Sequence, residues 1–364
     1  MPPKRVSKPD ADRTSKKARK TVTQVSKLKK TIKVLSKTVN YSLCIPTTIL
    51  ANCRNLEQIT SAVYQVAKAA TIFNVGEIVI LDLGQKSNRE NKGPNSLSDA
   101  MLIASLLQYF VTPPYLVNTV FKKQYRRYFQ EASKLPRLSS LPFMRHLDED
   151  KGRYREGLAI RMTKPGSNST TKKGKEFKQT KYINIGKAEP LQLKTQLVPV
   201  NVRVTVDTIE HRVVSPQEAY GDFVGAQASY GYHVRVAKSF GSVFTECALP
   251  NGYSQAIWAN SGDYYYNEQL TKHRKHETKL PYITNILTPD GDGEAVAPTA
   301  NVLVVCGRWD HISDSFQRSK HQFEGCDGAH QFFDGQLQLP GSAPQGLVPI
   351  QDCCMISLAL LANL

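Results

Sequence analysis

The stretch from residue 56 to residue 82 constrains the fold of this chain more than any other. Residues 56–73 place apolar side chains at helical spacing, and Glu77-Ile-Val-Ile-Leu81 follows as an almost wholly apolar run that ends at Asp82. A strand without polar alternation is buried on both faces, which is typical of a parallel strand covered by helices. The segment therefore predicts an α/β layer fold built on a parallel sheet.

The same alternation continues along the chain. Ser98 is a suitable N-cap for a helix over residues 99–110, and a further helix is expected near Tyr115. A short helix over 237–246 and an apolar helix over 350–361 are predicted in the C-terminal half. The remaining strands of this α/β part are predicted at residues 41–45, 232–236, 254–259 and 301–306.

The middle of the chain has a different character. Residues 164–181 are polar and lysine-rich, and no helical pattern is present between about residues 150 and 212. Short β-like runs lie there instead, at 157–161, 182–185 and 199–206. We interpret this region as an all-β insertion. The predicted organisation is a basic tail over 1–38, a first α/β half over 39–149, the insertion over 150–212 and a second α/β half over 213–364.

The N-terminal tail indicates the class of partner. Thirteen of the 48 Lys and Arg residues lie in the first 38 positions, against two acids. Such a segment lacks the apolar residues to fold alone, so we expect it to be disordered or to fold only on RNA. Basic side chains near phosphates displace condensed counterions, which favours a nucleic-acid partner. A solubilising or nuclear-targeting arm is the alternative.

Composition and motifs exclude several classes of protein. The chain has no apolar run long enough to cross a bilayer, and its seven cysteines favour the nucleus or cytosol. It contains no GxGxxG or Walker-type phosphate loop and no GxSxG elbow. No metal is predicted, because His311, His321, Cys326 and His330 are spaced too loosely for zinc. We interpret residues 272–276 as a charged surface loop.

Three glycine-bearing loops form a candidate ligand site. Residues 258–262, 306–308 and 340–346 are each placed directly after a predicted strand. Ligands of open α/β sheets bind at the carboxyl ends of strands, so these loops could converge on one small molecule through backbone groups. By spacing alone, ordinary strand-to-helix turns are the simpler interpretation.

Residues 121–129 form a candidate RNA contact, because they mix four basic with four aromatic side chains. This pattern suits phosphate contact and base stacking. In the alternative, an amphipathic helix packs its aromatic side chains inward, and only the basic ones contact RNA. The predicted RNA contacts of the whole chain are Lys16, Lys17, Arg19, Lys20, Lys29, Lys30, Lys122, Lys123, Arg126, Arg127, Lys172 and Lys173.

Several segments in one order carry a family resemblance. They include Ile49-Leu-Ala-Asn52, Tyr154-Arg-Glu-Gly157, Tyr230-Gly-Tyr-His-Val-Arg235 and Leu303-Val-Val-Cys-Gly307. The chain from about residue 40 to 364 thereby resembles the SPOUT-class (α/β-knot) RNA methyltransferases with an inserted OB-like domain. The resemblance implies a trefoil-knotted α/β domain, S-adenosylmethionine as cofactor and a homodimer or a heterodimer with a related subunit. It also implies uridine N3 of ribosomal RNA as target, with pre-ribosomal proteins in the nucleolus as partners.

The resemblance also implies site residues. Arg235 is the implied catalytic residue, as a contact to phosphate or to the target base. The implied cofactor contacts are Asn260, Gly262, Cys306, Gly307, Pro340, Gly341, Gly346 and Ile350.

The chain departs from the family pattern at these loops. Trp258 replaces a glycine, and Arg308 and His311 stand where the family has further glycines. Trp258 and Arg308 are expected to remove backbone freedom and to add bulk at the adenosine cleft. We therefore predict a methyltransferase-like protein with a degenerate cofactor site that binds pre-ribosomal RNA in rRNA processing and ribosome biogenesis. The alternatives are an active rRNA (uridine N3) methyltransferase and a general single-strand RNA binder.

Deletion of residues 1–38 should weaken RNA binding and flatten its salt dependence. For single-stranded RNA, each phosphate that the protein no longer neutralises changes the slope of log K against log salt concentration by about 0.7. Fluorescence anisotropy with a labelled rRNA fragment, over a series of KCl concentrations, measures both quantities. A slope equal to that of the full chain would show that the tail does not touch phosphate.

Overall fold

The computed structural model describes residues 39–84, 96–144, 152–161, 178–220, 231–249, 252–261, 264–275, 278–287, 300–340 and 348–364. The predicted basic tail and most of the predicted lysine-rich loop lie outside these residues. Among the helices of the described residues, none is long and apolar enough to cross a membrane.

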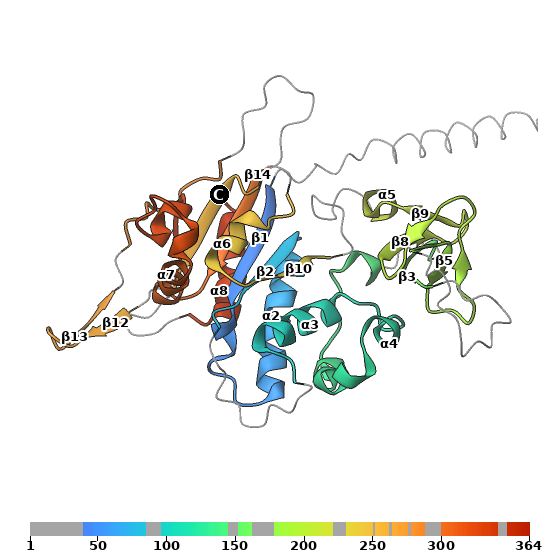
Figure 1. Cartoon of the computed structure of the whole chain (residues 1–364), viewed down its shortest axis with the longest axis horizontal. Helices are drawn as coiled ribbons and strands as arrows, with labels where there is room; N and C mark the ends of the chain where they lie inside the picture. Colours follow the sequence, from blue (N-terminus) through green and yellow to red (C-terminus); the bar gives the residue numbers. More distant parts are fainter. Residues whose placement is uncertain are drawn as a thin grey trace, which may run out of the picture. The chain divides into compact units, whose positions relative to one another are not determined.

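The α/β part of the described chain is built on a six-stranded sheet in the order β10-β2-β1-β14-β11-β15 (Figure 1). Every neighbouring pair in this sheet is parallel, as the apolar run at residues 77–81 predicts. The strands are β1 (Val39–Pro46), β2 (Glu77–Leu81), β10 (His233–Ala237), β11 (Gln255–Asn260), β14 (Ala300–Cys306) and β15 (Gly335–Gln338).

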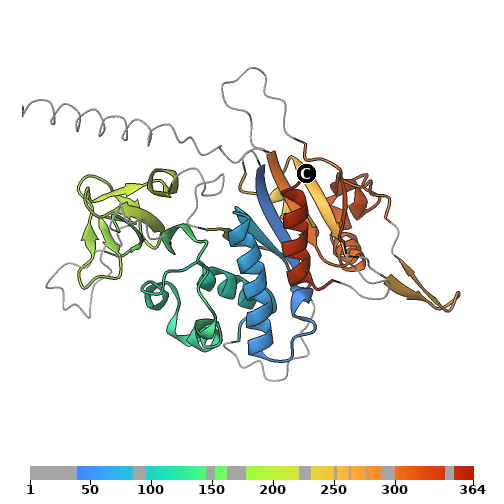
Figure 2. The ribbon, with the colours of Figure 1, turned by 180° about the vertical axis from the view of Figure 1, so that it is seen from behind.

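Helices cover both faces of this sheet. Side chains alternate along each strand, so Leu43 and Ile45 of β1 join one core cluster and Cys44 joins the other. The first cluster includes residues of α2 (Leu56–Ile72), α3 (Asp99–Phe110) and α8 (Ile350–Leu361), and Figure 2 shows α2 and α8 side by side in front of the sheet. The second includes residues of α6 (Phe240–Thr245) and α7 (Trp309–Arg318).

The insertion is an antiparallel five-stranded sheet in the order β6-β5-β3-β8-β9, among the described residues. It has a small core of its own that includes Ile183, Ile185 and Val206. This confirms an α/β fold with a parallel sheet and an all-β insert. The strands are β3 (Tyr154–Ala159), β5 (Tyr182–Asn184), β6 (Leu191–Gln192), β8 (Arg203–Asp207) and β9 (Arg212–Val214), with β4 (Gln179–Thr180) paired to β7 (Val198–Pro199). The predicted domain bounds stay predictions.

The predictions for single helices, caps and loops are partly confirmed. Ser98 Oγ accepts a hydrogen bond from the Met101 backbone N–H and caps α3 as predicted. The helix expected near Tyr115 is only the single turn α4 (Val117–Val120). The predicted surface loop at 272–276 is wrong, because Lys272–Lys275 forms strand β13, paired with β12 (Tyr264–Asn267). The short elements are α5 (Pro216–Tyr220) and the 3₁₀ turns η1 (Thr47–Leu50), η2 (Lys123–Phe129), η3 (Ala132–Lys134), η4 (Pro142–Met144), η5 (Lys320–Gln322) and η6 (Ala329–Phe332).

A buried polar network joins the insertion to the segment after α3. The Glu156 carboxyl, fully buried in β3, accepts hydrogen bonds from Thr205 Oγ1 (2.6 Å), Tyr220 OH (3.0 Å) and Arg203 Nε (3.2 Å). Arg203 Nη1 also donates to the carbonyl oxygen of Val111 at 2.6 Å, directly after α3. A buried carboxyl needs such partners, so these contacts hold the insertion at one place on the α/β part.

Tyr115 reinforces the same joint. Its hydroxyl donates to the carbonyl oxygen of Glu156 at 3.0 Å, and the Arg155 guanidinium lies 4.4 Å from the centre of its ring. Gly186 has φ of +74°, and a Cβ there would come within 2.4 Å of the Tyr115 ring. The pKa of Tyr115 is raised to about 12, and burial of the hydroxyl is the largest cause. The hydroxyl therefore stays protonated and acts as a hydrogen-bond donor.

Substitution of Glu156 should destabilise the protein strongly. Glu156→Ala removes the acceptor of the Arg203 Nε–H and of the buried Tyr220 hydroxyl, and we expect the free energy of unfolding to fall by about 3–5 kcal/mol. Urea unfolding followed by circular dichroism measures the change. Glu189→Ala, at an exposed position of the same insertion, is the matched control and should change stability by less than about 0.5 kcal/mol. Equal effects of the two substitutions would contradict the network's role.

Candidate functional site

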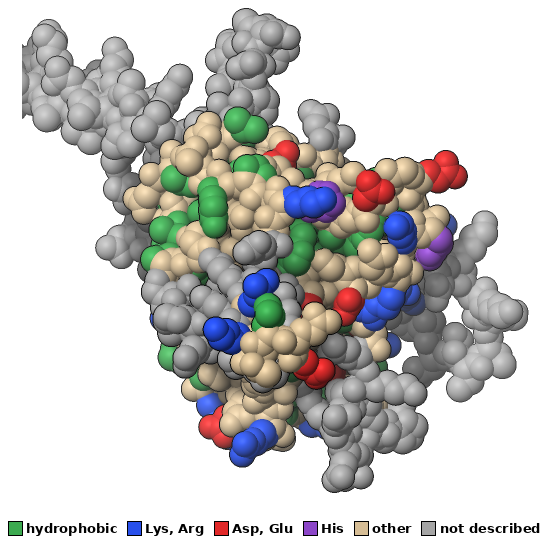
Figure 3. Space-filling model, turned by 90° about the vertical axis from the view of Figure 1, so that its left-hand side faces the viewer, with side chains coloured by type: hydrophobic (Ala, Val, Ile, Leu, Met, Phe, Trp, Pro, Cys, Tyr) green, Lys and Arg blue, Asp and Glu red, His purple; other side chains and the backbone are tan. Residues whose placement is uncertain are grey.

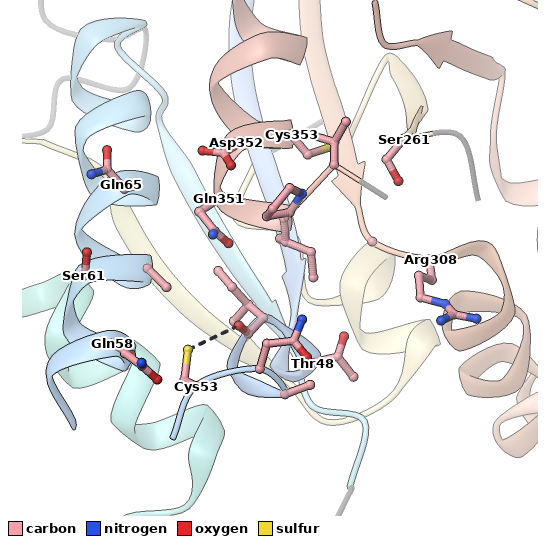
Figure 4. Close-up of a pocket in the computed structure, with 18 of the residues that line it drawn as sticks. Thr48, Cys53, Gln58, Ser61, Gln65, Ser261, Arg308, Gln351, Asp352 and Cys353 are labelled. Atoms are coloured by element: carbon pink, nitrogen blue, oxygen red, sulfur yellow. Dashed lines mark hydrogen bonds between the residues drawn. The ribbon is translucent and has the colours of Figure 1, made fainter. Parts of the chain in front are cut away.

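The sheet changes direction between β1 and β14. From β1 the chain proceeds through β2 to β10 on one side, whereas β14, β11 and β15 lie on the other. The connections on the two sides of such a switch point leave in opposite directions and open a crevice at the carboxyl ends of the strands. A cavity of about 770 Å³ lies at this place (Figure 4).

Segments from distant parts of the sequence line this cavity. Thr48 follows β1, Ser261 follows β11, and Gly307 and Arg308 follow β14. The opposite wall is formed by the first turn of α8 and by a polar row on α2. The row on α2 consists of Gln58, Ser61 and Gln65, and the α8 wall includes Gln351 and Asp352 (Figure 4).

The backbone of Gly307 forms a tight part of the cavity wall. Its φ is +130°, a conformation that side chains with a Cβ rarely adopt, and a Cβ there would lie 2.8 Å from Cγ of Pro46. Only glycine therefore fits where the end of β14 meets the end of β1. The packing of the two strand ends against each other therefore accounts for this glycine.

Two polar atoms of the cavity lining lack partners. Thr48 Oγ1 and His311 Nδ1 are both buried, and neither has a hydrogen-bond partner among the described residues. An unsatisfied buried polar atom costs roughly 1–3 kcal/mol. Both residues line the same cavity, from η1 and from the first turn of α7, but the two atoms themselves are buried beneath its surface, so a ligand would contact them only after the side chains rotate.

The charges of the cavity wall are partly paired. Arg308 donates from Nε to Asp310 Oδ1 at 3.0 Å and from Nη2 to Oδ2 at 2.5 Å. Burial raises the pKa of Asp310, but the hydrogen bonds from Arg308, the charges of His311 and Arg308 and the His311 backbone N–H together outweigh it, so the pKa lies below its usual value. Asp352, in the first turn of α8, is the only acid among the described lining residues. The described residues contain no cluster of metal-ligating side chains.

The structure brings only some of the predicted cofactor residues together. Gly307 and Ile350 line the cavity. Asn260 and Cys306 do not line it: Asn260 Nδ2 donates to Gln336 Oε1 at 2.8 Å, and Cys306 packs against α8. Pro340 is exposed outside the cavity lining. The predicted Gly262, Gly341 and Gly346 lie outside the described residues, and the cofactor roles of all eight stay predictions.

Trp258, which was expected to add bulk at the adenosine cleft, does not line this cavity. Trp258 is fully buried on the opposite face of the sheet, against α6 and α7, because strand alternation directs residues 257 and 259 to the other side. Its Nε1–H donates to the carbonyl oxygen of Gly307 at 2.9 Å, and its ring centre lies 5.0 Å from that of Trp309. Trp258 therefore supports the cavity wall from behind.

Arg308 also differs from the expectation. It does line the cavity, but its φ of −67° and ψ of 139° are ordinary extended values, so it carries no backbone strain. Thr48 is a cavity residue that the sequence analysis did not identify.

Only the strand order, which places β1 beside β14, shows that the segment after β1 lies next to Gly307.

Arg235, the implied catalytic residue, lies outside the cavity lining. Its guanidinium donates to Glu77 Oε1 (2.9 Å) and to the carbonyl oxygens of Ser242 (2.7 Å) and Val243 (3.0 Å) near the end of α6. These contacts satisfy helix carbonyls and a partly buried carboxyl, which is a structural role. A catalytic role of Arg235 stays a prediction.

The predicted basic contacts at residues 122–127 are exposed, and their aromatic neighbours are not. Phe129 is buried and its ring stacks on Tyr109 with centres 4.9 Å apart. The segment is a 3₁₀ turn rather than an amphipathic helix, yet its aromatic side chains pack inward as in the alternative interpretation. Lys122, Lys123, Arg126 and Arg127 therefore stay predicted RNA contacts. The other predicted contacts, in 1–38 and at Lys172 and Lys173, lie outside the described residues.

Comparison with known proteins gives consistent matches. Residues 40–361 match a family described as "Putative RNA methyltransferase". Two putative methyltransferases of Saccharomyces cerevisiae are 48% identical over 316 residues (87% of this chain, 92% of that protein) and 40% identical over 345 residues (94% of each). The 28S rRNA (uridine-N(3))-methyltransferase of Homo sapiens is 32% identical over 229 residues, which are 59% of this chain and 56% of the human protein.

Proposed function

We propose that this chain, which belongs to the putative RNA methyltransferase family, binds S-adenosylmethionine in the cavity between β1 and β14 and methylates ribosomal RNA at uridine N3. The observation that carries the proposal is the cavity itself, which lies at the switch point of a parallel sheet and is lined by the segments that follow β1, β11 and β14. The choice of uridine N3 is supported by the name of the human relative.

The described residues fit such a cofactor. The cavity volume lies within the usual range of about 300–1,000 Å³ for ligand pockets. Gly307 contributes backbone without a side chain to the lining, and the side chains of Thr48 and His311 could turn a polar atom toward a ligand, since Thr48 Oγ1 and His311 Nδ1 have no partner among the described residues. Of the two bulky departures from the family pattern, Trp258 does not line this space and only Arg308 does.

The chain's share of the reaction would be binding and positioning. S-adenosylmethionine, when bound, supplies an activated methyl group. Thr48, Gly307 and His311 would orient it, since fixed geometry alone contributes strongly to such transfers. The N3 proton of a uridine must leave, and the Asp352 carboxylate on the first turn of α8 is the cavity group that we assign to accept it.

A second candidate is an assembly factor that binds RNA and does not transfer a methyl group. The observation that favours it is the composition of one cavity wall, where Arg308 and His311 replace the glycines of the family pattern. The bulky side chains would then exclude the cofactor. Cofactor binding separates the two candidates.

The family resemblance also implies a knotted fold, an oligomeric state and cellular partners for this chain. We propose that the α/β part is a SPOUT-type trefoil knot and that the insertion is OB-like. We also propose that the chain forms a dimer with itself or a related subunit and works with pre-ribosomal proteins in the nucleolus. These points rest on the sequence resemblance to SPOUT-class enzymes, whereas the family match and the human relative support the RNA methyltransferase family and an rRNA substrate.

Calorimetric titration with S-adenosylmethionine should give micromolar binding to the full chain. Thr48→Val removes one polar contact and should weaken binding about two- to tenfold. Thr60→Val is the matched control, because Thr60 Oγ1 is also buried without a partner among the described residues but lies on α2 outside the cavity lining. Asp352→Asn should retain binding and lose transfer of labelled methyl groups to rRNA.

The outcomes separate the candidates. Equal affinities of the Thr48→Val and Thr60→Val variants would place the cofactor elsewhere. No binding at millimolar cofactor by a folded chain would contradict the enzyme and leave the assembly factor.

A further inference from the structure

The hairpin of β12 and β13 stands apart from both sheets. Its strands pair antiparallel with each other and, within the described residues, with no other strand. Figures 1 and 2 both show it projecting from the α/β part beyond β11 and α7. A two-stranded ribbon is marginally stable alone, and the side chains described in it, at 268–272 and 274, are exposed. Core packing therefore does not explain the residues at these exposed positions.

The base of the hairpin is held at the rim of the cavity. Tyr264, the first residue of β12, follows the cavity residue Ser261 by three positions. After β13 the chain returns along the edge strand β15. Gln336 of β15 donates from Nε2 to the carbonyl oxygen of Leu280 (2.7 Å) and from its backbone N–H to that of Pro281 (2.8 Å). The hairpin is therefore anchored on both sides of its base.

The register gives the hairpin a mixed aromatic and basic composition. The pairs are Tyr264 with Lys275, Tyr265 with Arg274, Tyr266 with His273 and Asn267 with Lys272. Directly opposite residues occupy the same face of an antiparallel ribbon, so each face holds tyrosine and cationic positions. The two strands contain no acid. Lys272 and Arg274 are exposed. Figure 3 views the molecule from the hairpin's side and shows Lys and Arg side chains there, with some acidic ones among them.

We propose that this hairpin binds single-stranded RNA next to the cavity. Lys272 and Arg274 contact phosphates, and Tyr265, on the same face of the ribbon, provides a stacking position for a base. Its place at the cavity rim would present a nearby nucleotide to the site. This inference rests on the proposed function for RNA as the ligand, but it requires neither cofactor nor methyl transfer.

The test is RNA binding by the full chain carrying Lys272→Ala and Arg274→Ala. Fluorescence anisotropy with a labelled oligouridylate of about 12 nucleotides should show about tenfold weaker binding at low salt. The slope of log K against log salt should fall by about 1.4, which corresponds to two phosphate contacts. The control is Lys238→Ala with Lys320→Ala, which removes the same charge from exposed positions elsewhere. Tyr265→Ala should also weaken binding, and Tyr265→Phe should restore it.

The outcomes are distinguishable. If the hairpin and control variants show the same reduction in affinity, only net charge matters and the inference is overturned. If the wild-type chain binds RNA and both variants match it, the hairpin is not a contact but the proposed function stands. If the wild-type chain binds neither this probe nor an rRNA fragment, the proposed function itself fails.

Discussion

The parallel pairing of β1 with β14 is the contact on which the rest of the structure depends. It joins residues 39–44 to residues 300–305, and Asn40 Nδ2 donates to Asn301 Oδ1 at 3.2 Å across 261 positions of sequence. Both strands are buried on both faces, so the pairing excludes water from the centre of the fold. Because the chain leaves this pair in opposite directions, the cavity opens where both strands end.

The cavity wall depends on support from the other face of the sheet. Trp258 holds the carbonyl of Gly307 from behind, and Pro46 leaves no room for a side chain at position 307. The glycine that steric contact requires is present, whereas the departures at Arg308 and His311 fall on the start of α7, where an ordinary backbone accommodates them. Substitutions relative to a family pattern therefore carry different weight according to the face on which they lie.

Two attachments to this scaffold contrast physically. The insertion is docked by the buried Glu156 network, whose polar groups are costly to separate. The β12–β13 hairpin pairs with no other strand of the described residues, and its residues Lys272 and Arg274 are exposed. The first arrangement suits a fixed position relative to the sheet, and the second suits a surface that meets a flexible ligand.

The sequence by itself determined the elements that one local signal specifies. The apolar run at Glu77–Leu81 predicts a buried parallel strand, Ser98 predicts the start of α3, and the absence of helical periodicity over 150–212 predicts the β insertion. Hydrophobic period and capping are properties of neighbouring residues, so no tertiary information is needed. Family resemblance supplied the cofactor and the RNA target as expectations.

Only the tertiary structure decided which residues share the cavity. Thr48 and Gly307 meet because β1 lies beside β14, and Trp258 is removed from the cavity by the alternation of a strand whose partners are distant in sequence. Residues 272–275 become a strand because a tyrosine-rich partner lies opposite them, which their own charge does not reveal. Strand order and facing depend on pairing between remote segments, and a single sequence does not contain that pairing as a local pattern.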